Sequence, residues 1–358
     1  MSADPNDALR APQVTVAPLV ARAAVADRRA DRRLQTAIED FFLAENDRLD
    51  DRTRAAIGTL LTDAIGAIAG EIVGHAARQL SGQWPRPGGA GLVSRLSASG
   101  LLRDAGLMSE LLGQTRQDLL ADALRSNRAP GAQPVLLAQL AGCGDGVIAA
   151  AARLYLQTEN RRRTVGGAHG SDFPAHLHRQ LIWWTAAAVR EQLIAAGGRL
   201  DRLDRALVAG AQRSIAAHDD DDRLDAVALR LAAAIDARPE ELPDLLAGAL
   251  DEGYPALFCA ILAHALGIDF GEARALVLDP EGDVLWFALR AHHADRASIA
   301  RVGLALADAD PRRDIEAFAD DLDAIAAITP DDARVALATL SLPADFRAAV
   351  RALGRIGA

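Results

Sequence analysis

The chain has 358 residues, of which 50% are apolar and only 4% aromatic, and its formal net charge is −10. This length exceeds the size at which one hydrophobic core usually keeps growing, so we expect about two domains or one elongated array of repeats. All 39 basic residues are Arg, and the two short Arg clusters near residues 28–33 and 161–163 are too small to make a negative chain bind nucleic acid.

The cysteine count and the chain start indicate the compartment. Cys143 and Cys259 lie far apart without a paired motif, which is typical of a reduced intracellular protein. The first residues carry acids and prolines where a secretory signal would need a basic and then an apolar segment. The longest stretches without Asp, Glu or Arg fall short of the roughly 20 apolar residues of a membrane span. We expect a soluble, cytoplasmic protein with no membrane span.

Residues 1–13 are predicted to be a disordered lead, and residues 14–163 an N-terminal helical domain. A first helix pair is expected from about residue 32, with Asp50 and Asp51 starting a long helix whose apolar face runs from Ile57 to Ala76. The Pro- and Gly-rich segment 82–91 breaks the chain. Shorter helices are predicted beyond it, at about 92–98, 104–112, 115–125, 133–141 and 146–160.

Residues 164–172 are predicted to be a linker, because paired glycines follow the basic end of a helix. Residues 173–358 then form a C-terminal helical repeat domain. Thr329 with Pro330 is a typical helix start, and Pro239 suggests another. The predicted helices are 173–196, 201–217, 222–236, 239–251, 254–266, 270–278, 282–292, 295–308, 312–327, 330–340 and 343–356.

The pattern predicts an all-α protein. Leu285, Ala288, Leu289 and His292 fall at i, i+3, i+4 and i+7, and this helical period recurs along the chain without a convincing strand. Helix pairs recurring every 25 to 45 residues or so favour a HEAT-like solenoid, although no consensus string repeats. A compact helical bundle array is the alternative.

Two segments carry a family resemblance. Arg32–Leu49 with Asp51–Ile57 resembles the opening of a bacterial family of unknown function, DUF2336, and Ala309–Phe318 resembles its longer members. The resemblance is closer in the first half of the chain than in the second. It implies a HEAT-like helical protein of the bacterial cytoplasm with no assigned activity, so it supplies no catalytic residues.

Histidines are the first candidates for chemistry. His169, His176 and His178 lie near Asp172, but positions 176 and 178 point to different faces of a helix, and the spacing matches no usual zinc pattern. We therefore expect no metal and no cofactor. His264 sits in an apolar stretch and is expected in the core, and His292 with His293 at a helix end.

Motifs for catalysis are missing from the sequence. Glu71 and His75 lack the second histidine of a zinc-protease helix, and Gly142–Gly146 lacks the Lys-Ser/Thr of a phosphate loop. The acidic run Asp219–Asp222 lacks the Gly and Glu of a calcium loop. Since neither Cys has an activating signature either, we expect a protein that is not an enzyme.

Trp183 and Trp184 are the strongest hint of binding. Neighbouring helix positions point about 100° apart, so the helix is expected to be sandwiched between two neighbours that bury both rings; the alternative is that one ring faces a groove. With Arg161, Arg162 and Arg163 they form the candidate partner-binding set.

The leading hypothesis is a helical-repeat scaffold or regulatory adaptor that binds another protein. The alternative is a small-molecule-responsive regulator or enzyme with a pocket between the halves, and a homodimer through the N-terminal helix stays open.

Overall fold

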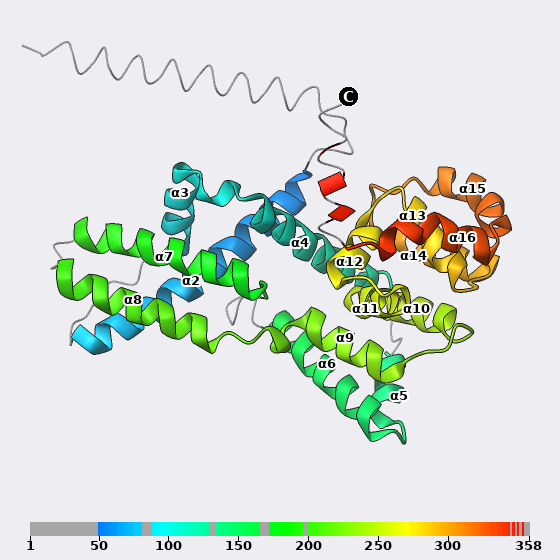
Figure 1. The fold of residues 1–358 in the computed structure, drawn as a ribbon, viewed down its shortest axis with the longest axis horizontal. Helices are drawn as coiled ribbons and strands as arrows, with labels where there is room; N and C mark the ends of the chain where they lie inside the picture. The colour runs from blue at the N-terminus through cyan, green and yellow to red at the C-terminus, as the bar shows by residue number, and fades with distance from the viewer. Residues whose placement is uncertain are drawn as a thin grey trace, which may run out of the picture. The chain divides into compact units, whose positions relative to one another are not determined.

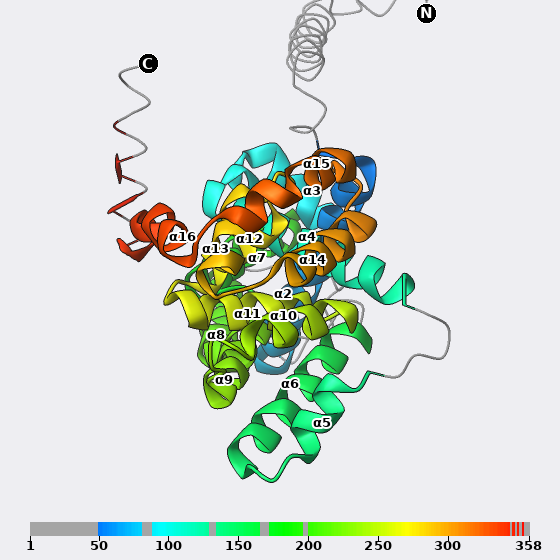
Figure 2. The ribbon, with the colours of Figure 1, turned by 90° about the vertical axis from the view of Figure 1, so that its right-hand side faces the viewer.

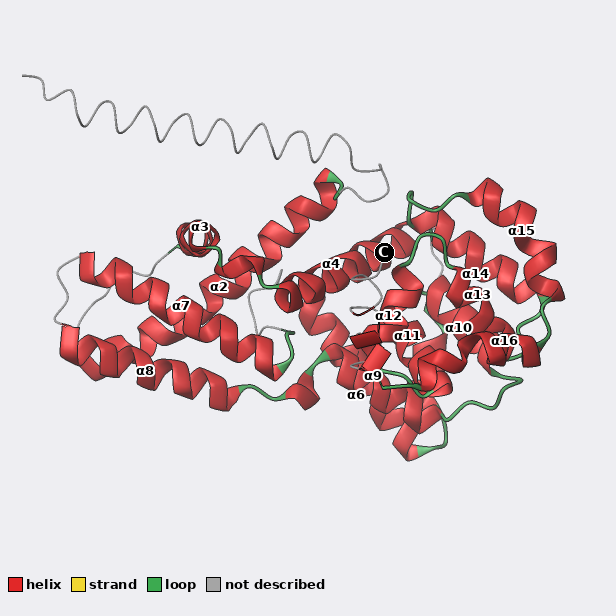
Figure 3. Ribbon diagram, turned by 45° about the horizontal axis from the view of Figure 1, so that its top comes forward, coloured by secondary structure: helices red, strands yellow, loops and turns green. Residues whose placement is uncertain are grey.

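A computed structural model describes residues 49–80, 88–128, 134–164, 172–195 and 200–343, together with a few positions up to 353. These residues hold 15 α-helices and no strand, which confirms the all-α prediction (Figure 3). Residues 51–358 make one compact unit, separate from residues 1–50. The predicted lead 1–13 and the first helices up to residue 48 lie outside the described residues.

Five helices precede the predicted linker. They are α2 (Asp51–Leu80), α3 (Gly89–Ser99), α4 (Ala105–Ser126), α5 (Leu136–Gly142) and α6 (Gly146–Thr164). The ten that follow are α7 (Ala175–Ala195), α8 (Leu200–Ala217), α9 (Leu224–Ile235), α10 (Leu242–Asp251), α11 (Pro255–Leu266), α12 (Phe270–Leu278), α13 (Asp283–Ala291), α14 (Arg296–Ala309), α15 (Ile315–Ala327) and α16 (Pro330–Leu337).

Side-chain caps explain several helix starts. Asp104 accepts a hydrogen bond from Leu107 N at 2.8 Å, and Asp295 accepts one from Ser298 N at the same distance. Thr329 caps α16 ahead of Pro330, as the sequence predicts. The start predicted at Pro239 is wrong, because α10 begins at Leu242 with Pro243 in its first turn.

The buried apolar residues form two separate cores that share α4. The first core joins α2, α3, α7 and α8 to the start of α4, including Leu107 and Leu111. The second joins α5, α6 and α9–α16 to the end of α4, including Leu120 and Leu124. In Figure 1 the helices of the first core lie on the left and most of those of the second on the right, with α4 between them. The two helices predicted at 104–112 and 115–125 are therefore one continuous helix that bridges the cores.

The two cores do not divide at residues 164–172. Helices α5 and α6 precede this segment but belong to the second core, where α6 packs on α9. Helices α7 and α8 follow it but pack on α2 in the first core. The proposed linker lies mostly outside the described residues, and a boundary there stays a prediction for proteolysis.

The second core is an array of helices around α4 rather than a simple stack. In a solenoid each repeat contacts its sequence neighbours. Here α4 contacts α10, α11, α12 and α14, while α13 packs on α16 and α10 on α14. Figure 2 looks onto α13–α16 with α10 and α11 below them. A helical array thus fits the structure, and a regular HEAT-like solenoid is not confirmed.

Helix α2 is the centre of the first core. It contacts α3, α4, α7 and α8, and α8 approaches it closely at Gly210, where a Cβ would lie 3.1 Å from Ile72 O. By length and hydropathy, Asp51–Gln79 could cross a membrane, and 44% of its apolar window is buried in the fold. One such helix is weak evidence for a membrane span, because core helices of soluble proteins pass the same test of length and hydropathy.

Candidate functional site

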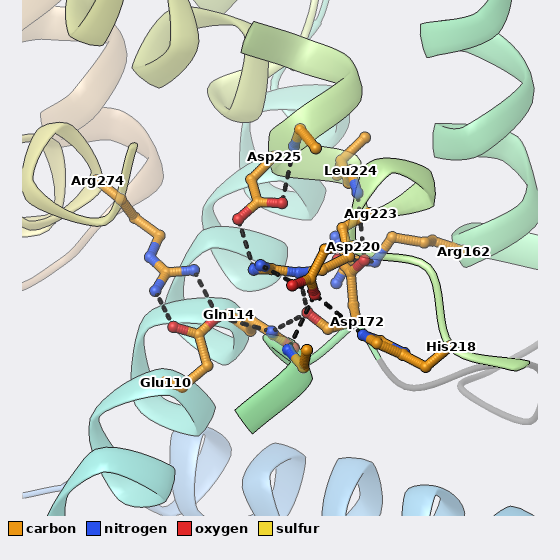
Figure 4. Close-up of polar contacts among 12 residues, drawn as sticks. Glu110, Gln114, Arg162, Asp172, His218, Asp220, Arg223, Leu224, Asp225 and Arg274 are labelled. Atoms are coloured by element: carbon orange, nitrogen blue, oxygen red, sulfur yellow. Dashed lines mark hydrogen bonds and ion pairs between the residues drawn. The ribbon is translucent and has the colours of Figure 1, made fainter. Parts of the chain in front are cut away.

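A network of charged side chains lies where α4 passes from one core to the other. Glu110, Gln114 and Asp118 follow one another at i, i+4 and i+8, so they share one face of α4. Side chains from four other segments meet this face. We call the set the polar belt; its residues are Glu110, Gln114, Asp118, Arg162, Asp172, Arg223, Asp225 and Arg274. Figure 4 labels all of them except Asp118.

Asp172, just before α7, holds the centre of the belt. Its backbone oxygen accepts hydrogen bonds from Gln114 Nε2 at 2.9 Å and from Arg223 Nε at 3.0 Å. Its carboxylate accepts one from Leu224 N at 3.2 Å and lies 3.3 Å from Arg162 Nε. One residue therefore connects α4, α6, α7 and the start of α9 (Figure 4).

Glu110 and Arg274 make the most enclosed ion pair of the belt. Two guanidinium nitrogens lie 2.6 and 3.2 Å from the carboxylate, and the side chains are only 14% and 10% exposed. Burial raises the pKa of Glu110, but the hydrogen bond and charge of Arg274 outweigh it and hold that pKa below its usual value. Gly113 leaves room for this pair, since a Cβ there would lie 2.8 Å from the guanidinium of Arg274.

At the other end of the belt, the effect of burial on two carboxyl pKa values outweighs that of their arginine partners. Arg162 Nη2 donates to Asp118 at 3.0 Å, yet burial raises the pKa of Asp118 despite this partner. Arg223 Nη2 donates to Asp225 at 2.5 Å, and burial raises the pKa of that carboxyl too. Each carboxylate is already held by a guanidinium. The belt therefore fastens helices from both cores together and offers no uncommitted base for catalysis.

Two stacked histidines adjoin the belt. The rings of His178 on α7 and His218 after α8 lie 4.2 Å apart at 20°, and His218 Nε2 is 3.0 Å from Asp220 Oδ1. The same Asp220 oxygen accepts a hydrogen bond from Ala175 N at 2.9 Å. Burial, together with His218, lowers the pKa of His178 to about 4. His178 is thus a neutral, buried ring.

The two tryptophans of α7 have different surroundings. Trp183 is 37% exposed, whereas Trp184 packs against the first core. The exposed positions His176, Arg179 and Ala187 lie one or two turns away along the helix, on the side of Trp183. Trp183 is therefore the more exposed of the two rings.

The three arginines at the end of α6 also differ. Arg162 belongs to the polar belt and is only 19% exposed. Arg161 and Arg163 are exposed, and Arg161 donates to Asp222 O at 3.2 Å. Arg162 consequently holds the fold together, and only its two neighbours face outward.

The remaining histidines are mostly at the surface. The core position expected for His264 is wrong, because its side chain is 38% exposed and lies 3.0 Å from Asp236. Glu71 accepts a hydrogen bond from Ser214 at 2.7 Å, which ties α2 to α8. His169 lies outside the described residues. Within those that are described, no three His, Cys, Asp or Glu side chains gather as they would around a metal ion.

Two adjoining cavities open along α11. One of about 230 Å³ and one of about 310 Å³ share Ala265 and His292 in their walls. We call this depression the α11 groove; besides these two residues its walls include Asp236, Leu242, Leu245, Ile261, His264, Leu266, Arg334, Leu337 and Leu340. It lies within the second core, away from the pocket expected near Arg161–Arg163 and His176.

The comparisons with known proteins give a family for the second half of the chain. Residues 168–338 match a family described as "Uncharacterised protein conserved in bacteria (DUF2336)". Over these residues, just under half of the chain, the protein is similar to that family. The DUF2336 region includes Ala309–Phe318 but not Arg32–Ile57, so the match covers the second half, where the sequence shows the looser resemblance. No curated protein and no solved structure matches the chain.

The DUF2336 region spans α7–α16 and therefore contributes to both cores. Sequence reasoning missed the polar belt and the α11 groove. The spacing of Glu110, Gln114 and Asp118 was a signal for the belt, because it gives α4 a polar stripe beside its apolar one. Nothing local signalled Arg274, which meets Glu110 from a distant helix.

Proposed function

We propose that the protein is a non-enzymatic helical scaffold or regulatory adaptor that binds another protein through the outer face of α7. The observation that carries the proposal is the exposure of Trp183 beside Trp184, which is partly buried against the first core. Trp is enriched among the residues that dominate binding energy, so a partly exposed Trp ring is a suitable anchor for a partner.

The neighbouring surface suits a protein partner. Val208 on α8 is 44% exposed, and the ion pair between Arg190 and Asp204, at 2.6 Å, joins α7 to α8. In this antiparallel pair, Val208 stands close to the level of Ala187, one turn from Trp183. An apolar centre with a charged rim is the usual composition of a binding surface.

The two tryptophans test the proposal. Trp183→Ala should weaken partner binding by about 2 kcal/mol or more with little change in melting temperature. Trp184→Ala should instead cost about 3 kcal/mol of folding stability, because it leaves a cavity in the core. Val147→Ala, which changes an exposed apolar residue on α6, is the matched control and should leave both quantities unchanged.

Binding is measured by capturing partners from native lysate on the immobilised wild-type chain and its variants. A protein captured in stoichiometric amounts by wild type and Val147→Ala, and lost with Trp183→Ala, supports the proposal. Equal capture by all three, or no captured protein, contradicts it.

A further inference from the structure

An apolar stripe follows α16 near the C-terminus. Phe346, Val350 and Leu353 are helical, stand at i, i+4 and i+7, and are 56%, 52% and 71% exposed. We call these three residues the tail stripe. In the sequence Arg347, Arg351 and Arg355 alternate with it, so the tail is a basic amphipathic segment within a negative chain.

The α11 groove has the complementary character. Most of its lining side chains are apolar, and α11 and α13 end at its walls, at Leu266 and Ala291, while α9 ends at Ile235, just before the lining residue Asp236. Helix C-termini carry a partial negative charge, and the carboxylate of Asp236, 83% exposed, adds a full one. Arg334 is the opposing charge, but Asp331 already pairs with it at 2.6 Å. The groove therefore suits an apolar helix with basic flanks.

The tail begins at the rim of this groove without occupying it. Leu340 lines the groove only six residues before Phe346. In this structure Arg347 pairs with Glu272 on α12 and donates to Leu342 O, which holds this residue of the tail against α12. A tail that starts at a groove it does not fill is well placed to enter the same groove of a neighbouring molecule.

We propose that two copies of this chain form a dimer in which each tail stripe enters the α11 groove of the other. The exchange has two-fold symmetry, so both contacts are identical and the assembly closes. Each contact buries Phe346, Val350 and Leu353 against the apolar lining side chains and sets the tail's arginines against the helix ends and Asp236. This interface is distinct from the partner surface around Trp183.

Analytical ultracentrifugation over a concentration series measures the dimer. Phe346→Ser/Val350→Ser removes the stripe, and Ala265→Trp fills the groove; each should raise the dissociation constant at least tenfold. Asp236→Asn should raise it severalfold and, as Asn tolerates the left-handed backbone at this position, it should fold normally. Val147→Ser, exposed on α6, is the control and should dimerise like wild type.

Mixing the variants identifies which surfaces meet. The Ala265→Trp chain keeps an intact tail and the Phe346→Ser/Val350→Ser chain an intact groove, so their mixture should regain one contact and associate although neither does so alone. Tail-to-tail packing predicts no association in the mixture. A monomeric wild type at all concentrations, unchanged dimers in the tail variant, or a mixture that stays monomeric overturns the proposal.

Discussion

Glu110→Gln tests whether the polar belt holds the two cores together. The change removes the charge that faces Arg274, a side chain only 10% exposed. Breaking one partner of such an enclosed pair costs about 3–5 kcal/mol, and we expect about 3 kcal/mol here, since Gln can still accept one hydrogen bond. Gln114 Nε2 donates both to Glu110 Oε1 at 2.8 Å and to Asp172 O at 2.9 Å, so the loss reports on the ion pair together with the Gln114 bond to Glu110. Urea denaturation followed by circular dichroism measures the free energy of unfolding.

Two further variants make this result specific. The double variant Glu110→Leu/Arg274→Met removes both charges and should return to within about 1 kcal/mol of wild type, because no buried charge is left unpaired. The exposed pair of Arg95 and Glu191, at 2.8 Å, is the control, and Glu191→Gln should cost less than about 1 kcal/mol. If Glu110→Gln costs no more than Glu191→Gln, the reasoning about the belt is refuted.

For two other substitutions the structure predicts the direction of the change in folding stability. Gly303→Ala places a Cβ against the Phe318 ring and should lower the free energy of unfolding, measured by urea denaturation, by about 1–3 kcal/mol. Gly271→Ala is the control: nothing lies within 4 Å of its Cβ, so it should be neutral or stabilising. Equal losses in the two variants would contradict this reasoning. His178→Gln should flatten the pH dependence of stability. The folded-state pKa of His178 is about 4, below the usual 6.5, so the unfolded chain takes up the proton first and wild type loses up to about 3 kcal/mol as pH falls from 6.5 to 4. His176→Gln, on the exposed face of α7, should keep the wild-type slope.

Local patterns predicted the helices well. The Thr329 cap and the long helix after Asp51 both follow from residues within a few positions of each other. The error at residues 112–115 has a physical cause. Gly113 reads as a helix break, yet the glycine is needed inside α4 because the guanidinium of Arg274 lies against it.

Local sequence patterns could not predict the contacts between segments that are distant in the chain. The Glu110–Arg274 pair joins residues 164 positions apart, and periodicity carries no information on which helices meet. His264 shows the same limit, since its apolar neighbours belong to the buried side of α11 while the imidazole reaches Asp236 at the surface. The assignment of α5–α8 to cores on opposite sides of α4 likewise depends on tertiary packing alone.

The interleaving of the two cores affects how the chain can fold during synthesis. Helix α2 is complete by residue 80, but its main partner α8 begins only at residue 200. At a synthesis rate of about 5–20 residues per second, the apolar face of α2 stays without its partner α8 for on the order of ten seconds. Helices α5 and α6 are synthesised during this interval, before their packing partner α9 exists. A nascent chain stalled near residue 164 should therefore hold two incomplete interiors at once and depend on chaperones more than a chain with successive domains would.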